Sequence, residues 1–107
     1  MIKRCLILFL LISVSHSAIA QSKWFGGTIK MVYPLANGDF ILIFNNDNPS
    51  CTSTYHYTRV GKNGVTKEGI QFLYSAALAA AASGKKVSIN FYSSGKQCYV
   101  NRLHMTF

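Results

Sequence analysis

Apolar and polar residues alternate along much of the chain with a period of two, which is the pattern of half-buried β-strands. The first such segment covers residues 24–33. Its alternation puts Ile29, Met31 and Tyr33 on one face, so we expect that face to lie against a core. Two adjacent glycines near the start of the segment permit a bulge or a sharp bend. The pattern therefore predicts a first strand that bends close to its beginning.

Two more strands are predicted before residue 61. Asn37-Gly38 is expected to form a tight hairpin turn, because this dipeptide accepts positive φ at both central positions. Residues 40–44 read FILIF and are apolar on both faces, which predicts a central strand covered on two sides. After a polar loop, residues 51–60 alternate without an aliphatic face. We therefore expect this third strand to lie at an edge or an interface.

A helix is predicted between Thr66 and Gly84. Thr66 is the expected N-cap, and Glu68 lies in the first turn, where a negative charge favours the helix dipole. Gly84 supplies the left-handed residue that ends many helices. Apolar residues at helical spacing form a core-facing stripe of Ile70, Leu73, Tyr74, Ala77, Leu78 and Ala81.

Two strands follow the helix. Residues 87–91 alternate, and residues 93–96 turn the chain into a last strand. The apolar phase of that last strand changes near its middle, which predicts a bulge at Asn101 or Arg102. The resulting order, β-β-β-α-β-β, is that of the OB-fold, a small five-stranded Greek-key barrel. An open α+β sheet with one packed helix is the alternative.

Residues 1–20 have the features of a cleaved signal peptide of bacterial type. Lys3 and Arg4 give a basic start, and the roughly ten apolar residues that follow are too few for the ~20 of a spanning helix. Residues 18–20 read Ala-Ile-Ala, the small-x-small pattern of a signal peptidase site. We therefore expect a secreted or periplasmic protein without stable membrane insertion, folded as a single OB-fold-like domain over residues 21–107.

Removal of this segment changes the cysteine count and the charge. Cys51 and Cys98 remain, and an even pair in an oxidising compartment predicts one structural disulfide. Without Lys3 and Arg4, nine of the eleven Lys and Arg residues stand against three acidic residues, a net charge of +6. Such a charge favours anionic partners, although the basic residues are scattered along the chain.

No constellation of residues points to an enzyme. Three acidic residues give little basis for a carboxylate pair, and a lone histidine in a strand, such as His56 or His104, is more often packed than a ligand. We therefore expect no catalytic residue, no metal site and no cofactor. OB-folds often bind single-stranded nucleic acid, but export argues against that partner.

The helix face opposite the core stripe is unusually apolar. A helix that is apolar nearly all round is buried on nearly all sides, and one small domain cannot easily cover both faces of its helix. Neighbouring chains are the expected cover; the alternative is that alanine, the best helix former, is tolerated in water. The predicted oligomer or pore-lining face consists of Phe72, Ala76, Ala79, Ala80 and Ala82.

Candidate glycan-binding residues follow from residue type. Shallow sugar sites combine an aromatic ring with short polar side chains, and a nearby lysine can pair with an acidic sugar. For each aromatic candidate, core or interface packing is the alternative. The candidates are Trp24, Asn46, Asp47, Tyr55 and Tyr57.

Residues 72–107, FLYSAALAAAASGKKVSINFYSSGKQCYVNRLHMTF, resemble small secreted B subunits of AB5 toxins, of the subtilase-cytotoxin and pertussis-like types. The similar features are a helix ending in Ser-Gly-Lys, a Val-x-Ile strand, a short loop with a cysteine and a final strand.

The resemblance implies an OB-fold subunit in a homopentameric ring whose helices line a central pore. It also implies binding of cell-surface glycans, sialylated ones among them, and delivery of a separate catalytic A subunit. No sugar-contacting residue of that family can be placed on this sequence. A periplasmic or secreted inhibitor or immunity protein, acting by surface binding, is the alternative function.

Overall fold

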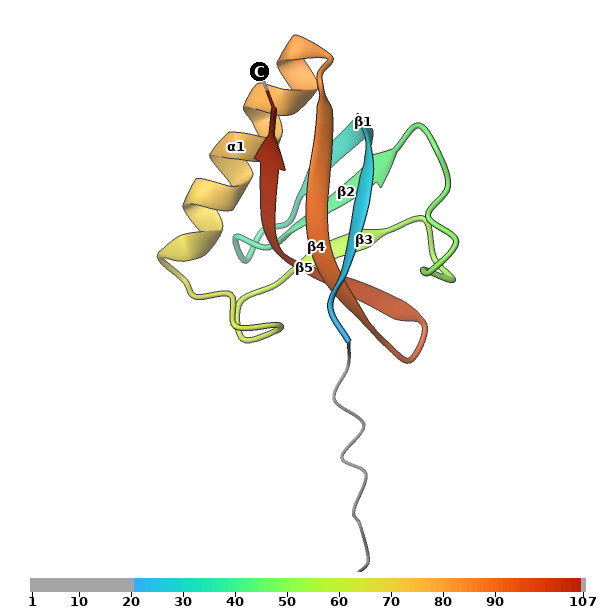
Figure 1. The fold of residues 1–107 in the computed structure, drawn as a ribbon. Coiled ribbons are helices and arrows are strands. Elements are labelled where there is room, and N and C mark those ends of the chain that lie inside the picture. Colours follow the sequence, from blue (N-terminus) through green and yellow to red (C-terminus); the bar gives the residue numbers. More distant parts are fainter. Residues whose placement is uncertain (1–20, 107) are drawn as a thin grey trace, which may run out of the picture.

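The computed structural model describes residues 21–106 as a closed five-stranded barrel with one helix beside it (Figure 1). The order around the barrel is β1-β2-β3-β5-β4, in which only β3 and β5 pair in parallel. The elements are β1 (Lys23–Pro34), β2 (Phe40–Phe44), β3 (His56–Thr58), α1 (Gly69–Ser83), β4 (Lys86–Ser94) and β5 (Gln97–Met105). The β-β-β-α-β-β order and the OB-fold are confirmed, and closure of the barrel rules out the open sheet. The proposed signal peptide, residues 1–20, lies outside the described residues.

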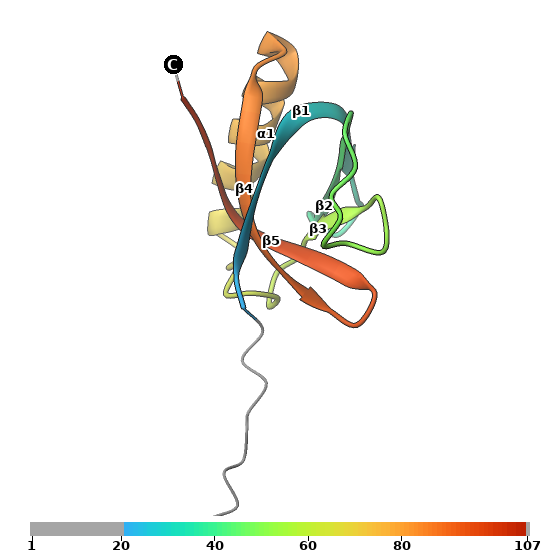
Figure 2. The same ribbon diagram turned by 45° about the vertical axis from the view of Figure 1, so that its right-hand side comes forward.

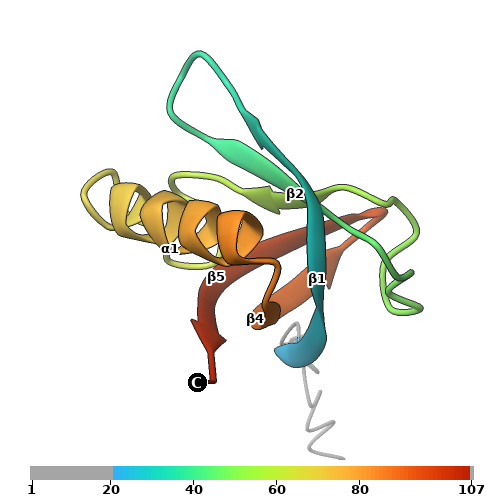
Figure 3. The same ribbon diagram turned by 90° about the horizontal axis from the view of Figure 1, so that it is seen from above.

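The core lies inside the barrel and under the helix. Alternate residues of β2 and β4 point inward, as the FILIF and Val-x-Ile patterns indicated. Helix α1 lies along one side of the barrel and packs on β1 and β5 (Figure 3). The core is built chiefly from Phe40, Leu42, Phe44, Ile70, Val87, Ile89, Phe91 and Val100.

Strand β1 is long and bent, and two neighbours share it (Figure 2). Residues 23–28 pair with β4, and residues 29–34 pair with β2. The register shifts at Lys30, between Ile29 and Met31, rather than at the two glycines. An inserted residue reverses the alternation that follows it. Val32 therefore packs on the core, and the expectation that Met31 and Tyr33 face the core with Ile29 is wrong.

The loop between β1 and β2 is a wider hairpin than the two-residue turn predicted. Of its residues only Gly38 has a positive φ, 93°. The Leu35 N–H donates to the Asp39 carbonyl oxygen at 2.7 Å, which closes a five-residue loop. The Asn37 side chain takes part by accepting the Asp39 N–H at 3.0 Å. This local bond competes with the tighter turn.

Strand β3 is shorter than predicted and is not an edge. It has three residues, and it pairs with β2 on one side and with β5 on the other. The preceding segment is held instead by local side-chain bonds, including the Tyr55 N–H to Ser53 Oγ at 3.1 Å. The predicted disulfide is confirmed there, joining Cys51 to Cys98 with their Cα atoms 5.9 Å apart.

The predicted C-terminal end of the helix is confirmed, whereas the N-cap is Glu68 rather than Thr66, so the prediction of Glu68 in the first turn is wrong. Thr66 Oγ1 accepts the Gly69 N–H at 2.9 Å, although regular helix begins only at Gly69 and Glu68 precedes it. Gly84 has φ 64° and donates its N–H to the Ala81 carbonyl oxygen. In the part of the chain that the structure describes, no helix is long and apolar enough to cross a membrane.

The helix is rotated relative to the predicted stripe. Leu78 is 43% exposed, so its placement in the core was wrong. Ala80 is fully buried, three positions after the buried Ala77 on the same face, so its assignment to the outer face was also wrong. An alanine allows a close approach of the helix to the barrel at this point, which a leucine would prevent.

The predicted bulge in the last strand is confirmed. Asn90 pairs with Arg102, but the next pair is Phe91 with Val100. Asn101 is therefore the extra residue on β5, and the apolar phase changes there because an inserted residue turns the following side chains over.

Candidate functional site

A row of mostly aromatic side chains crosses the outer surface of the barrel. Residues paired directly across strands project from the same face of a sheet. Tyr33 pairs with Ile41, Ile41 with Tyr57, Tyr57 with Tyr99, and Tyr99 with Tyr92. This row passes over all five strands. Together with Tyr55, two residues before Tyr57, we call it the tyrosine face: Tyr33, Ile41, Tyr55, Tyr57, Tyr92 and Tyr99.

Four rings of the tyrosine face, those of Tyr55, Tyr57, Tyr99 and Tyr92, form a continuous series. Ring centroids lie 6.3 Å apart for Tyr55 and Tyr57, 6.0 Å for Tyr57 and Tyr99, and 5.7 Å for Tyr92 and Tyr99. Tyr99 is buried beneath its neighbours, and its hydroxyl donates to Gln97 Oε1 at 2.5 Å. Edge and tilted contacts at these distances are the arrangements that aromatic rings favour. The buried Tyr99 therefore supports the rings around it, whereas Tyr55 remains 41% exposed.

Two cations lie over these rings. The Arg59 guanidinium carbon is 4.7 Å from the Tyr57 ring centroid, and the Lys62 ammonium is 5.6 Å from that of Tyr99. Both distances are within the range of cation–π attraction. Asn63 fixes the loop that carries Lys62, since its side-chain amide donates to the Tyr99 carbonyl oxygen at 3.1 Å. The cations are thereby held beside the aromatic row.

The predicted polar candidates Asn46 and Asp47 lie elsewhere, in a cleft of about 380 Å³ in the β2–β3 loop. Asn46 Nδ2 donates to the Gly26 carbonyl oxygen at 3.3 Å. A Cβ on Gly27 would collide with the Asn46 side chain. Asn46 therefore anchors the loop on β1, and the paired glycines leave room for it.

His56 lies at the inner wall of this cleft and is 2% exposed. Its Nδ1 faces the Leu42 and Thr54 carbonyl oxygens at 3.3 and 3.2 Å, so this nitrogen carries the hydrogen. Its Nε2 accepts from Asn48 Nδ2 at 3.3 Å. Burial lowers the pKa of His56 below the ordinary 6.5, and the two carbonyl bonds act in the opposite direction. The ring is packed as a neutral group.

Trp24 occupies a third position, on the outer surface of β1. It is 52% exposed, its ring centroid lies 5.1 Å from that of His104, and the Arg102 guanidinium carbon lies 5.2 Å from the Trp24 ring. The five glycan candidates are thus distributed over three places. The structure brings together Tyr55 with Tyr57, and Asn46 with Asp47, while Trp24 stands apart.

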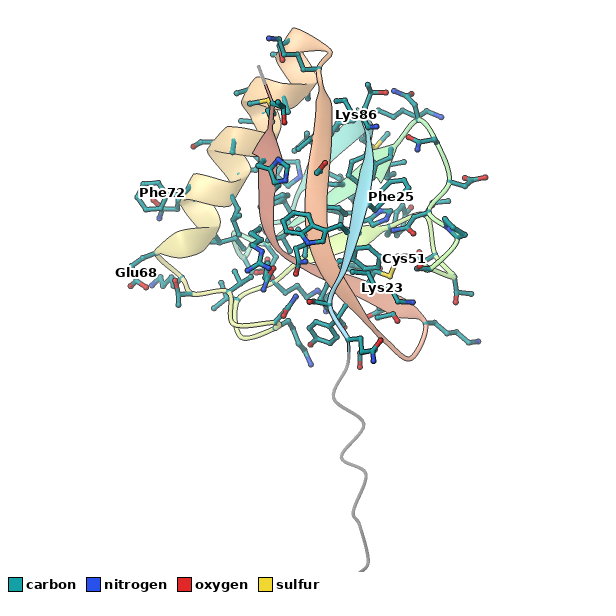
Figure 4. The ribbon with its side chains drawn as sticks, in the orientation of Figure 1. Lys23, Phe25, Cys51, Glu68, Phe72 and Lys86 are labelled. Atoms are coloured by element: carbon teal, nitrogen blue, oxygen red, sulfur yellow. A yellow bond between two sulfur atoms is a disulfide. The ribbon has the colours of Figure 1, made fainter. Side chains whose placement is uncertain are left out.

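Three of the five residues of the predicted outer face of α1 are exposed. Phe72 is 77% exposed and points away from the barrel (Figure 4). Ala79 and Ala82 are also exposed, Ala76 is half-buried, and Leu78 adds to the apolar area. Cys51 lies on the far side of the barrel from this helix (Figure 4).

The sequence interpretation missed Tyr33, Tyr92 and Tyr99. The turn between β4 and β5 is the two residues Gly95 and Lys96 rather than the predicted 93–96, and Tyr92 and Tyr99 are equidistant from it. Hairpin pairing from a turn at Gly95-Lys96 would have placed them opposite each other. Their meeting with Tyr57 depends on the parallel β3–β5 pair, for which the sequence carries no local signal. Among residues 21–106, no group of three or more His, Cys, Asp or Glu side chains is arranged to hold a metal ion.

Solved structures share this fold. The cholera toxin-like B subunit from Citrobacter freundii superposes with a TM-score of 0.63 and 13% identity, over 79% of this chain and 86% of the other. Human heat-labile enterotoxin, in complex with a blood group A antigen analog, superposes with a TM-score of 0.63 and 10% identity, over 85% of this chain and 91% of the other. No family model and no curated protein matches the sequence.

These identities establish likeness of fold alone. The barrel is the OB-fold of toxin B subunits, which confirms the resemblance noted from residues 72–107. The neighbours are of the cholera and heat-labile types, whereas the sequence suggested the subtilase and pertussis-like types. The disulfide fits a protein folded outside the cytoplasm.

Proposed function

We propose that this chain is a secreted, non-enzymatic binding subunit that recognises cell-surface glycans and assembles as a homo-oligomeric ring. In this proposal it acts as the B subunit of an AB5-type toxin and carries a separate catalytic A subunit. The fold shared with toxin B subunits supports this role. The observation that carries the proposal is the tyrosine face, an aromatic row on the outside of the barrel in which Tyr33 and Tyr55 are exposed while Ile41 and Tyr99 are buried.

The helix supports the assembly part of the proposal. Phe72 and the exposed alanines form an apolar strip on α1, and small residues let helices of neighbouring copies approach closely. Strand β5 also pairs with β4 alone from Arg102 to Met105, so its other edge is open among the described residues. An open edge and an apolar helix face are surfaces that a second copy can cover.

Two measurements test the proposal. Native mass spectrometry of the mature chain is expected to show a ring, and a homopentamer if the AB5 analogy holds. A glycan array is expected to show binding to cell-surface oligosaccharides. A monomer that binds no glycan would contradict the proposal and favour an inhibitor or immunity protein.

A further inference from the structure

We propose that the tyrosine face is the glycan-binding surface and that its ligand is an extended acidic oligosaccharide lying across the strands. This inference rests on the proposed function and specifies its site and ligand class. It transfers the binding role from Trp24 and the β2–β3 loop cleft to a surface that includes three tyrosines the sequence did not indicate.

The first argument is exposure. Outward positions of a barrel that faces water are normally polar, yet Tyr33 and Tyr55 are 48% and 41% exposed. Met31, two residues before Tyr33 on β1, is 47% exposed as well. A cluster of exposed apolar side chains of this kind marks a binding surface more often than an isolated one does.

The second argument is shape. The rings of Tyr55, Tyr57, Tyr99 and Tyr92 follow one another with successive centroids 6.3, 6.0 and 5.7 Å apart. A series of this length exceeds one sugar ring and suits a chain of several sugars. Tyrosine rings offer flat faces for pyranose rings, and their hydroxyls offer hydrogen bonds at the edges. The ligand is therefore expected to bind along the row rather than end-on in a pocket.

The third argument is charge. Arg59 and Lys62 are cations held beside the rings, and each can donate a charge-assisted hydrogen bond to a carboxylate or sulfate on the sugar. An acidic ligand follows from this arrangement.

The test compares three variants on an array of sialylated, sulfated, uronate-containing and neutral oligosaccharides. Tyr57→Ala is expected to weaken binding at least about tenfold, while Tyr57→Phe, which keeps the ring, is expected to lose less. Arg59→Gln is expected to abolish the preference for acidic over neutral probes and to reduce the dependence of binding on salt. Binding to the sialylated or uronate-containing probes would show that the chain recognises a sugar carboxylate, and binding to the sulfated probes would show that it recognises a sulfate.

Trp24→Ala is the matched control, an exposed aromatic residue outside the tyrosine face, and is expected to bind as the unaltered chain does. Far-ultraviolet circular dichroism establishes that each variant is folded. Three outcomes would overturn this inference while leaving the proposed function intact. They are unchanged affinity of Tyr57→Ala, loss of binding by Trp24→Ala, and recognition of neutral probes alone. If the unaltered chain binds none of the probes, that result would instead contradict the proposed function.

Discussion

At the residue scale, His56 is held in one tautomer and one charge state by its neighbours. Carbonyl oxygens of Leu42 and Thr54 require a hydrogen on Nδ1, and the Asn48 amide requires a lone pair on Nε2. The side-chain amide of Asn48 cannot rotate to exchange its oxygen and nitrogen, because its Oδ1 already accepts the Ser50 N–H at 3.0 Å. The geometry therefore fits neutral imidazole and opposes its protonated form.

The free energy of unfolding should consequently depend on pH. The folded-state pKa of His56 is lowered, so below about 6.5 the unfolded chain takes up the proton first and stability falls as pH decreases. Urea titrations at pH 7.5 and pH 5 should show a loss of stability that is smaller in His56→Phe. His104→Gln, on the exposed surface, serves as control. An identical pH response in His56→Phe would contradict this account.

Gly27 provides a second residue-scale prediction, because a Cβ there would meet the Asn46 side chain. Gly27→Ala should lower the free energy of unfolding by about 1 kcal/mol, because the Asn46 side chain must turn away and lose its hydrogen bond to the Gly26 carbonyl oxygen. Adding Asn46→Ala should recover part of that loss, since the two sites are in direct contact. Chemical denaturation of both single variants and the double variant measures the coupling, and strict additivity would show that the collision is not the cause.

At the element scale, local patterns predicted elements well and their orientation less well. The FILIF strand, the Gly84 helix stop and the Asn101 bulge were predictable because each depends on a few neighbouring residues. The rotation of α1 was not, since it depends on how closely the helix approaches β1 and β5. The same limit applies to the site: Tyr55 and Tyr57 were found by residue type, whereas Tyr99 joins them only through long-range pairing.

Ala79 and Ala80 are adjacent on α1, but the first is exposed and the second is buried. They therefore provide a matched pair of variants that tests the orientation of the helix. Ala79→Lys places a charge on the exposed face and should leave the barrel folded while it disrupts the proposed ring. Ala80→Lys places the same charge in the core, where an unpaired buried charge is strongly unfavourable, and should unfold the chain. Circular dichroism and native mass spectrometry separate the two outcomes. An intact ring with Ala79→Lys would show that this face is not an interface.

At the scale of the whole molecule, the disulfide joins the β2–β3 loop to the last strand. Cys51 and Cys98 are 47 positions apart, and the loop precedes β3, which has only three residues. The bond thus connects two parts of the chain next to the shortest strand of the barrel. Its position explains why so small a strand can be kept in register between β2 and β5.

Removal of this bond should be costly. Cys51→Ala with Cys98→Ala is expected to lower the free energy of unfolding by about 2–4 kcal/mol, because a cross-link of this span restricts the unfolded chain. Thermal and urea denaturation of the double variant measure the loss. Unchanged stability would show that the strand pairing alone maintains the barrel.

The parallel pairing of β3 with β5 also has a kinetic consequence. The barrel closes through two residue pairs, His56 with Cys98 and Tyr57 with Tyr99, and both partners on β5 come from the last tenth of the sequence. Contacts between distant residues form slowly, because the intervening chain must first be ordered. The barrel therefore cannot close before β5 has emerged, and β3 must wait for that strand to gain its second neighbour.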